Sequence, residues 1–207
     1  MIQLRAFRKA YLTRTILDIP DFQIDAGMYW IKGVNGAGKS TLFKAISGLI
    51  PFQGDVMIDE VSQKDAPTDY RRRVTYSEAE PLFPGFLSAK ELVRFVGKSR
   101  NTTISRQDAL CDRLGITTYF DAPCATYSSG MLKKASLALA FLGEPSVIIL
   151  DEPLVTLDDA SRSALDQLVA EHRQKKTFLI SSHETLTHGF SAVDGILEVA
   201  DQQLRRV

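Results

Sequence analysis

The sequence predicts an α/β protein with a mainly parallel sheet and helices on both faces. An antiparallel β subdomain at the N-terminus and an inserted α-helical subdomain are also expected. The last third alternates apolar strands at 147–151 and 177–181 with a helical stretch at 160–174, and such alternation is typical of parallel sheets. The first third is rich in Ile, Phe, Tyr and Trp and is interrupted by Pro20 and Gly27, which predicts short strands.

The other elements are predicted from hydrophobic spacing. Helices need apolar residues three or four positions apart and a polar residue at the start, whereas strands need short β-branched or aromatic runs. Ser88 and Ser105 are the expected N-caps of two middle helices, and residues 81–143 are expected to form the helical insertion. The expected strands are 2–7, 16–25, 28–32, 54–59, 147–151, 177–181, 195–200 and 203–207, and the expected helices are 38–48, 88–98, 105–115, 130–143 and 160–174.

Composition and charge exclude several classes of protein. The 207 residues are 44% hydrophobic, which suits one globular domain over 1–207, and 25 basic residues balance 25 acidic ones. A neutral chain gives no reason to expect a nucleic acid partner. The two cysteines have no metal-binding neighbours, the start lacks a signal-peptide run, and no stretch reaches the roughly 18–20 apolar residues that span a bilayer. We therefore expect a soluble cytosolic chain with no regulatory domain after its last strands.

A glycine-rich stretch between the expected strand 28–32 and helix 38–48 has the spacing G-x-x-x-x-G-K-S. Glycines let the backbone N–H groups converge on phosphate oxygens, and the following helix directs its positive end at the same anion. In this spacing the lysine reaches the β- and γ-phosphates and the serine hydroxyl binds Mg²⁺. The alternative is a turn that merely starts a helix. The residues expected to bind ATP are Gly33, Asn35, Gly36, Ala37, Gly38, Lys39, Ser40 and Thr41, with Ser40 also a metal ligand.

Two acidic residues and a histidine come after apolar strands. Asp151 and Glu152 are placed directly after 147–150, and His183 is placed after the strand 177–181. Because open α/β sheets place ligands at the carboxyl ends of their strands, these three side chains should share one site. Asp151 is expected to bind Mg²⁺, Glu152 to act as general base or to orient the attacking water, and His183 to contact the γ-phosphate or that water. The alternatives are a surface turn at the acidic pair and an ordinary polar histidine.

Five stretches occur in an order that is similar to the ATP-binding cassette (ABC) ATPase family: GVNGAGKST, YSSGM, VIILDEP, TLDD and SSHE. The resemblance covers essentially the whole chain and implies a P-loop NTPase core. It also implies that two subunits pair head to tail, so that Ser128 and Gly130 of one close over the γ-phosphate bound by the other. A helix cap alone would need the serine but not the glycine, which favours this interpretation. By the same resemblance, Leu157 and Asp158 communicate between the paired nucleotide sites, and Tyr11 stacks on adenine unless it is a core tyrosine.

The chain departs from the family pattern in two stretches. Members usually carry a glutamine where the sheet meets the helical subdomain, and counting back from 82–84 places Glu78 there. A glutamate can still touch Mg²⁺ or water, although it adds negative charge beside phosphate, so Glu78 is retained as an expected metal ligand. Ser129 and Met131 replace a glycine and a glutamine of the signature stretch at positions that vary in the family.

The resemblance implies a separate ATP-hydrolysing subunit that uses ATP and Mg²⁺. It dimerises with a copy of itself or a related chain and drives integral membrane permease subunits from the cytoplasmic face. The short length resembles compact ATPases of small exporters, so export is the expected direction. The apolar stretch 81–87 is expected to help form the groove for a helix of the membrane partner, with packing inside the helical subdomain as the alternative. The rival functions are a soluble ABC ATPase with a non-transport role and a non-hydrolysing nucleotide-binding regulator.

Overall fold

The structure is a computed structural model that describes residues 1–183, 190 and 192–207. Within these residues the strands form two sheets, and the larger has the order β10-β9-β3-β8-β7-β6. Strands β9, β3, β8, β7 and β6 run parallel, and β10 pairs antiparallel with β9 at one edge. The strands of this sheet are β3 (Met28–Lys32), β6 (Val74–Ser77), β7 (Val147–Asp151), β8 (Thr177–Ser181), β9 (Gly195–Ala200) and β10 (Gln203–Arg206).

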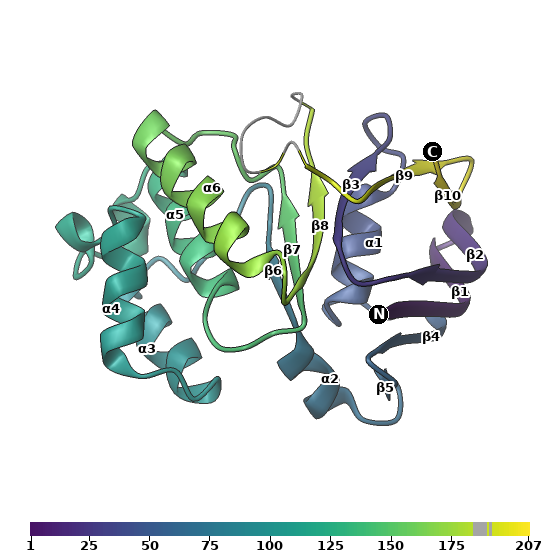
Figure 1. The fold of residues 1–207 in the computed structure, drawn as a ribbon, viewed down its shortest axis with the longest axis horizontal. Coiled ribbons are helices and arrows are strands. Elements are labelled where there is room, and N and C mark those ends of the chain that lie inside the picture. Colours follow the sequence, from purple (N-terminus) through teal and green to yellow (C-terminus); the bar gives the residue numbers. More distant parts are fainter. Residues whose placement is uncertain (184–189, 191) are drawn as a thin grey trace.

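The smaller sheet is antiparallel and comes from the N-terminal part of the chain. Its order is β2-β1-β4-β5, and it lies at the right of the molecule in Figure 1. The predicted α/β class, with a mainly parallel sheet and an antiparallel N-terminal part, is confirmed. The strands are β1 (Ile2–Tyr11), β2 (Arg14–Ile24), β4 (Gln53–Ile58) and β5 (Val61–Ser62).

Pro20 does not interrupt a strand, contrary to the prediction from the sequence. Strand β2 continues through it, with Ile19 and Asp21 paired to Phe7 and Arg5 of β1. β2 is the edge strand of its sheet, and an edge strand tolerates a proline because one row of its backbone N–H groups has no strand to pair with. Only the interruption at Gly27 separates two strands, β2 and β3.

Two apolar cores lie on opposite faces of the larger sheet. On one face, α1 (Lys39–Ile46) packs between the two sheets, and its Phe43 belongs to the same core as Ile149 of β7. On the other face, Ile148 of β7 and Leu137 belong to the core formed with the helices that follow β6. Successive residues of β7 therefore enter different cores, as a strand buried on both faces requires. This double burial fixes the end of β7, where the acidic pair lies.

Helices α3 to α6 cover one face and one end of the larger sheet, whereas α2 packs through Tyr70 into the same core as α1. In Figure 1, α3, α4 and α5 gather at the end of the molecule away from β1 and β2. Among the described residues no helix is both long and apolar enough to cross a membrane. The helices are α2 (Pro67–Arg73), α3 (Ala89–Ser99), α4 (Ile104–Arg113), α5 (Ser129–Ala140) and α6 (Asp159–His172), with short 3₁₀ helices η1 (Thr117–Tyr119) and η2 (Cys124–Thr126).

Of the two predicted N-caps, one is right and one is wrong. Ser88 caps α3 in a capping box, in which Glu91 Oε2 also accepts from the Ser88 backbone N–H at 2.8 Å. Helix α4 begins one residue before the predicted cap Ser105, and Thr103 Oγ1 accepts from the Arg106 N–H at 3.4 Å. Both Thr103 and Ser105 carry a hydroxyl, so residue type alone did not decide between them.

Candidate active site

A cleft of about 320 Å³ lies at the carboxyl ends of β3, β7 and β8. It brings together the glycine-rich loop, the acidic pair and the histidine, which are far apart in the sequence. This is the edge at which parallel α/β sheets bind ligands. The lining residues are Ile16, Asn35, Gly36, Gly38, Lys39, Ser40, Thr41, Ala79, Asp151, Glu152 and His183.

The glycine-rich loop has the geometry of an anion cradle. Gly36 and Gly38 have φ angles of 79° and 111°, in the region that favours glycine. Gly38 is the N-cap of α1 and provides no side-chain cap, so no side chain of the cap position satisfies the first N–H groups of this helix. Lys39 Nζ folds back onto the loop and donates to the carbonyl oxygen of Gly33 at 2.7 Å. The loop therefore offers a positive helix end and an ammonium group to the cleft.

Asp151 is buried and held by two hydroxyl groups. Ser181 Oγ donates to Asp151 Oδ1 at 2.5 Å, and the Tyr76 hydroxyl donates to Oδ2 at 3.0 Å. Burial raises the pKa of Tyr76, and the nearby Asp151 charge raises it further, so this hydroxyl keeps its proton and acts as a donor. Neither Tyr76 nor Ser181 was expected at the site, because their positions opposite Asp151 depend on the register of three strands.

Glu152 lies at the turn after β7 with a φ angle of 47°, which is rare outside glycine. Its backbone N–H donates to Ser181 Oγ at 3.0 Å, and its Oε2 accepts from the His183 N–H at 3.1 Å. Oε1 is buried and accepts no hydrogen bond from the described residues, with His183 Nε2 at 3.5 Å. Because Glu152 lines the cleft, its carboxylate is able to accept a proton from a water molecule there.

The segment that carries His183 is held by the neighbouring strand. The Trp30 indole N–H of β3 donates to the carbonyl oxygen of Ser182 at 3.3 Å. Lys32 Nζ lies 3.9 Å from the centre of the Trp30 ring, a cation–π contact on the same strand. The histidine that faces Glu152 is therefore anchored through the residue that precedes it.

Four predicted residues do not line the cleft: Gly33 and Ala37 of the glycine-rich loop, Tyr11 and Glu78. Tyr11 is 48% exposed at the end of β1, and Lys9 Nζ lies 4.5 Å from its ring centre. The Glu78 carboxylate lies 3.1 Å from Lys44 Nζ of α1, and the adjacent Ala79 lines the cleft instead. The wall of the cleft at the end of β6 therefore has a methyl group where a longer polar side chain was expected.

Ser128, Gly130 and Asp158 also lie outside this cleft. Ser128 is the N-cap of α5, and its Oγ accepts from the Met131 N–H at 3.3 Å. A methyl group at Gly130 would lie 2.7 Å from the carbonyl oxygen of Thr156. This close approach requires glycine within one chain, so Gly130 does not by itself indicate a phosphate partner, contrary to the prediction from the sequence.

A charged pair strengthens the same contact between α5 and the loop before α6. Lys134 Nζ donates to Asp158 Oδ2 at 2.6 Å, and the Ser161 N–H donates to Oδ1 at 2.8 Å. Together these bonds hold the pKa of Asp158 well below its usual range. Asp158 caps α6, so the signature stretch and the start of α6 are tied together.

Known proteins resemble this chain over most of its length. A family model described as ABC transporter matches residues 17–155. The chain is 32% identical over 188 residues to the aliphatic sulfonates import ATP-binding protein SsuB 2 of Burkholderia cenocepacia, which covers 89% of this chain and 68% of that protein. It is 29% identical over 185 residues to the lantibiotic transport ATP-binding protein SrtF of Streptococcus pyogenes, with 88% and 80% covered.

Solved structures agree with these relatives. The ATP-binding subunit of an ABC transporter superposes with a TM-score of 0.87 at 26% identity, over 100% of this chain and 89% of the other. A dimeric ATP-binding cassette in a post-hydrolysis state with ADP and Pi has a TM-score of 0.85 at 21% identity, over 100% of this chain and 98% of the other, which is a likeness of fold. The family model spans more than half of the chain, and the glycine-rich loop, the acidic pair and His183 of the chain meet in one cleft. This chain therefore belongs to the ABC transporter family and is an ATP-binding, ATP-hydrolysing member of it.

Proposed function

We propose that this chain is the ATPase subunit of a membrane transporter and works as one of a pair of ATPase subunits on the cytoplasmic face of the membrane. In this proposal residues 1–207 act as one ATPase domain, and 81–143 form its helical subdomain. The observation that carries the proposal is the cleft, where an anion cradle faces a buried acidic pair. The proposal covers both directions of transport, because similar proteins include a sulfonate importer and a lantibiotic transporter.

The cleft fits the triphosphate of ATP. The uncapped first turn of α1 and the backbone N–H groups around Gly36 and Gly38 suit phosphate oxygens, and Lys39 is close enough to exchange its loop carbonyl for phosphate. Thr41 and Asn35 complete the same wall. Tyr11, exposed on the end of β1, offers a ring face for the adenine base.

Ser40 and Asp151 are the residues that would hold Mg²⁺. Hydroxyl and carboxylate oxygens are the ligands this ion prefers, and both residues line the cleft. Bound there with ATP, the ion would neutralise charge that develops on the phosphate oxygens. Glu78 has no part in this proposal, because its carboxylate pairs with Lys44.

Glu152 and His183 supply the hydrolytic chemistry. The Glu152 carboxylate lines the cleft and accepts the proton of the attacking water or orients it, with Oε1 turned toward His183. His183 Nε2 lies 3.5 Å from this oxygen, and His183 also lines the cleft, so it can contact both the carboxylate and the γ-phosphate. Glu152 is the general base of the proposal, and His183 stabilises the charge at the transferred phosphoryl group.

A second ATPase subunit would complete the site. Ser128 and Gly130 sit at the N-terminus of α5, which is a favourable place for an anion, yet neither lines the cleft of its own chain. In the proposal they close over the ATP of the partner subunit. A dimeric cassette of the same fold with bound ADP and Pi supports this arrangement. Asp158, tied to α5 through Lys134, would lie at the same contact.

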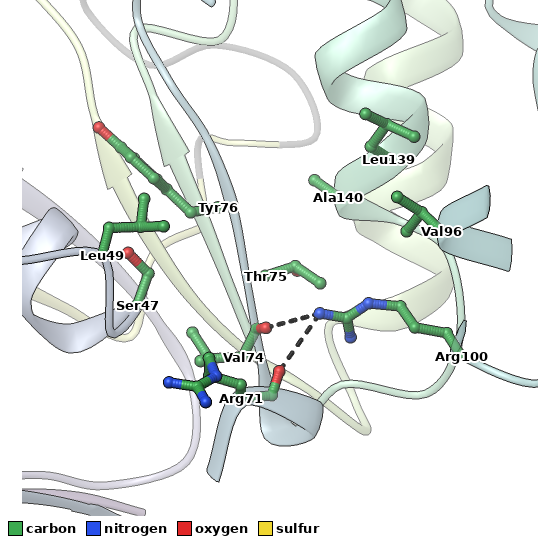
Figure 2. Close-up of a pocket in the computed structure, with 10 residues that line it drawn as sticks. All are labelled: Ser47, Leu49, Arg71, Val74, Thr75, Tyr76, Val96, Arg100, Leu139 and Ala140. Carbon is green, nitrogen blue, oxygen red and sulfur yellow. Dashed lines mark hydrogen bonds between the residues drawn. The ribbon is translucent and has the colours of Figure 1, made fainter. Parts of the chain in front are cut away.

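A second recess, of about 260 Å³, is the proposed docking site for the membrane partner. Figure 2 shows Val96, Leu139 and Ala140 on its helical side, with Leu49 and Tyr76 opposite. It spans the sheet and the helical subdomain, so a bound segment would respond to movement between them. None of residues 81–87 lines this recess in the described structure, although two of them, Leu82 and Phe86, are exposed.

Two residues connect the recess to the rest of the molecule. Arg100 Nη2, at the end of α3, donates to the carbonyl oxygens of Val74 at 3.0 Å and Arg71 at 3.3 Å, which ties the helical side to the sheet (Figure 2). Tyr76 lines the recess, and its hydroxyl binds Asp151 of the cleft. This tyrosine is thus a direct physical link between the docking recess and the nucleotide cleft.

Substituting Tyr76→Phe should lower the affinity for Mg²⁺ about 10-fold, because a hydrogen bond that orients a metal-binding carboxylate is lost. The measurement is the Mg²⁺ concentration that gives half-maximal ATP hydrolysis. Tyr70→Phe is the matched control, since its buried hydroxyl donates to the Ile46 carbonyl oxygen at 2.6 Å, away from Asp151. An equal Mg²⁺ dependence in both variants would remove Tyr76 from the metal site.

The transporter proposal is tested by capture from native membranes. The Glu152→Gln chain, extracted in mild detergent, should bring down an integral membrane protein in comparable amount. Leu49→Glu in the same background should lose that partner, because a carboxylate replaces an apolar side chain of the recess at a residue that is 58% exposed. Ile104→Glu, at a 62% exposed residue of α4, is the control. Recovery of soluble partners alone would instead assign the chain to a soluble ABC ATPase.

A further inference from the structure

Lys133 is a lysine inside the protein. It lies on α5, five residues after Ser128, and is 1% exposed. Its Nζ donates to the carbonyl oxygens of Glu78 and Asp151, each at 2.6 Å, and is 3.5 Å from that of Ala79. Within the described part of the chain no carboxylate lies within ion-pair distance of this ammonium group. Its partners are thus backbone atoms, and they belong to two separate segments.

Both segments carry residues of the cleft that must keep their positions during ATP hydrolysis. Asp151 ends β7 and is followed by Glu152, while Glu78 and Ala79 begin the connection from β6 to α3. Ala79, Asp151 and Glu152 all line the cleft. A single ammonium group therefore joins the end of β7, the entry to the helical subdomain, and the helix that begins after Ser128.

The hydrogen bonds of Lys133 connect two segments that the neighbouring side chains leave unconnected. The Glu78 carboxylate is turned to Lys44, and Ala79 has only a methyl group, so neither side chain bridges the end of β6 to the acidic pair. Burial lowers the pKa of Lys133 to about 8, although the charges of Asp151, Glu152 and Glu78 oppose this shift. Keeping an ammonium group in such a place is costly unless its hydrogen bonds are made.

We propose that Lys133 is a positioning residue for ATP hydrolysis, which clamps the β6–α3 connection to the end of β7 and couples both to α5. This inference rests on the proposed ATPase cycle. The clamp keeps Ala79 and Glu152 in one arrangement around the attacking water. It also makes α5, with Ser128 at its N-terminus, move together with the catalytic end of β7. The phosphate loop makes no hydrogen bond with Lys133 in the described structure, so we expect the clamp to act on hydrolysis more than on ATP binding.

The chain contains a matched control for this lysine. Lys176 has a side chain that is 6% exposed, and its Nζ donates to the Pro145 carbonyl oxygen at 3.1 Å and to Glu144 Oε2 at 2.9 Å. It directly precedes β8 and so lies at the end of the sheet opposite the cleft. Replacing either lysine with methionine removes a buried ammonium group that donates to a backbone carbonyl, but only Lys133 is next to the catalytic residues.

The test compares ATP hydrolysis by the full-length wild-type chain with that of Lys133→Met, Lys133→Arg and Lys176→Met. For Lys133→Met we expect kcat to fall on the order of 10–100-fold, because small displacements of catalytic groups have effects of this size. KM for ATP should stay within about threefold, which marks a loss specific to the transition state. Lys133→Arg should restore part of kcat, and Lys176→Met should keep it, even if both methionine variants unfold at lower temperature.

A Lys133→Met chain that hydrolyses ATP as fast as Lys176→Met overturns the inference. A rise in KM that accounts for the whole fall in kcat/KM, with kcat unchanged, overturns it as well. That result would mean that the substitution weakens ATP binding and does not slow hydrolysis. If Lys133→Met does not fold, Lys133→Gln, which keeps an N–H donor, takes its place under the same criteria. Wild-type protein that binds ATP but never hydrolyses it would refute the proposed function itself, which separates that failure from a failure of the clamp.

Discussion

The Glu152→Gln chain should hydrolyse ATP on the order of 10²–10⁴-fold more slowly than the wild-type chain, which is the usual effect of losing a positioned general base. Glutamine is nearly the same size but does not accept a proton. The effect should be large because the Glu152 carboxylate lines the cleft beside Ser40 and Asp151 and is the proposed proton acceptor. ATP binding should persist, since the glycine-rich loop is unchanged.

The measurement is phosphate release at saturating ATP, together with ATP affinity by equilibrium titration. Glu171→Gln is the control, because Glu171 pairs with Arg113 through bonds of 2.8 and 2.9 Å on the surface. It should retain normal turnover. In the proposed pairing, the Glu152→Gln chain should also elute as a dimer when ATP is present. A variant that still turns over ATP at the wild-type rate would show that Glu152 is not the base.

The second large effect is expected for Lys39→Met. Nζ of Lys39 now satisfies the Gly33 carbonyl oxygen at 2.7 Å, and it should move to the β- and γ-phosphates when ATP binds. Loss of one charged partner of a buried pair typically costs roughly 2 kcal/mol or more, so ATP affinity should fall about 30-fold or more. Glu152→Gln should slow hydrolysis, whereas Lys39→Met should weaken the binding of ATP itself.

Titration with ATP and with ADP distinguishes this role from a structural one. The weakening should be larger for ATP, because ADP lacks the γ-phosphate that the ammonium group contacts. Lys90→Met is the control, since Lys90 is exposed on α3 and pairs with Asp121 at 2.9 Å. Equal weakening for both nucleotides would indicate that Lys39 mainly stabilises the loop through its carbonyl contacts.

The main parts of the site could be predicted from the sequence because each is a local pattern. The glycine spacing before Lys39 and the apolar run before Asp151 each specify a strand end and the functional residues next to it, and the parallel order then brings those ends together. The residues that hold Asp151 could not be found in this way. Tyr76 and Ser181 reach it only through the register of β6 and β8 against β7, which is a property of three distant segments.

At the end of β6, prediction from the sequence missed the residue that lines the cleft by one position. Counting back along the chain selected Glu78, whereas the cleft is lined by Ala79. Glu78 pairs with Lys44 of α1 whereas Ala79 lines the cleft, so a shift of one position exchanges a carboxylate for a methyl group. Gly130 is a related case, because its need for glycine arises from the Thr156 carbonyl oxygen, which lies in another loop.

The hydrogen bond from Trp30 to the Ser182 carbonyl oxygen gives the chain an intrinsic fluorescent probe near His183. Trp30 is the single tryptophan of the sequence, and its indole N–H is bonded to the residue before His183. Indole fluorescence responds to the polarity around the ring and to the loss of a hydrogen bond. Emission excited near the red edge of protein absorption therefore comes from one place, next to the Ser182 carbonyl oxygen. A change at this hydrogen bond on nucleotide binding or phosphate release would be followed in stopped flow without attaching any dye.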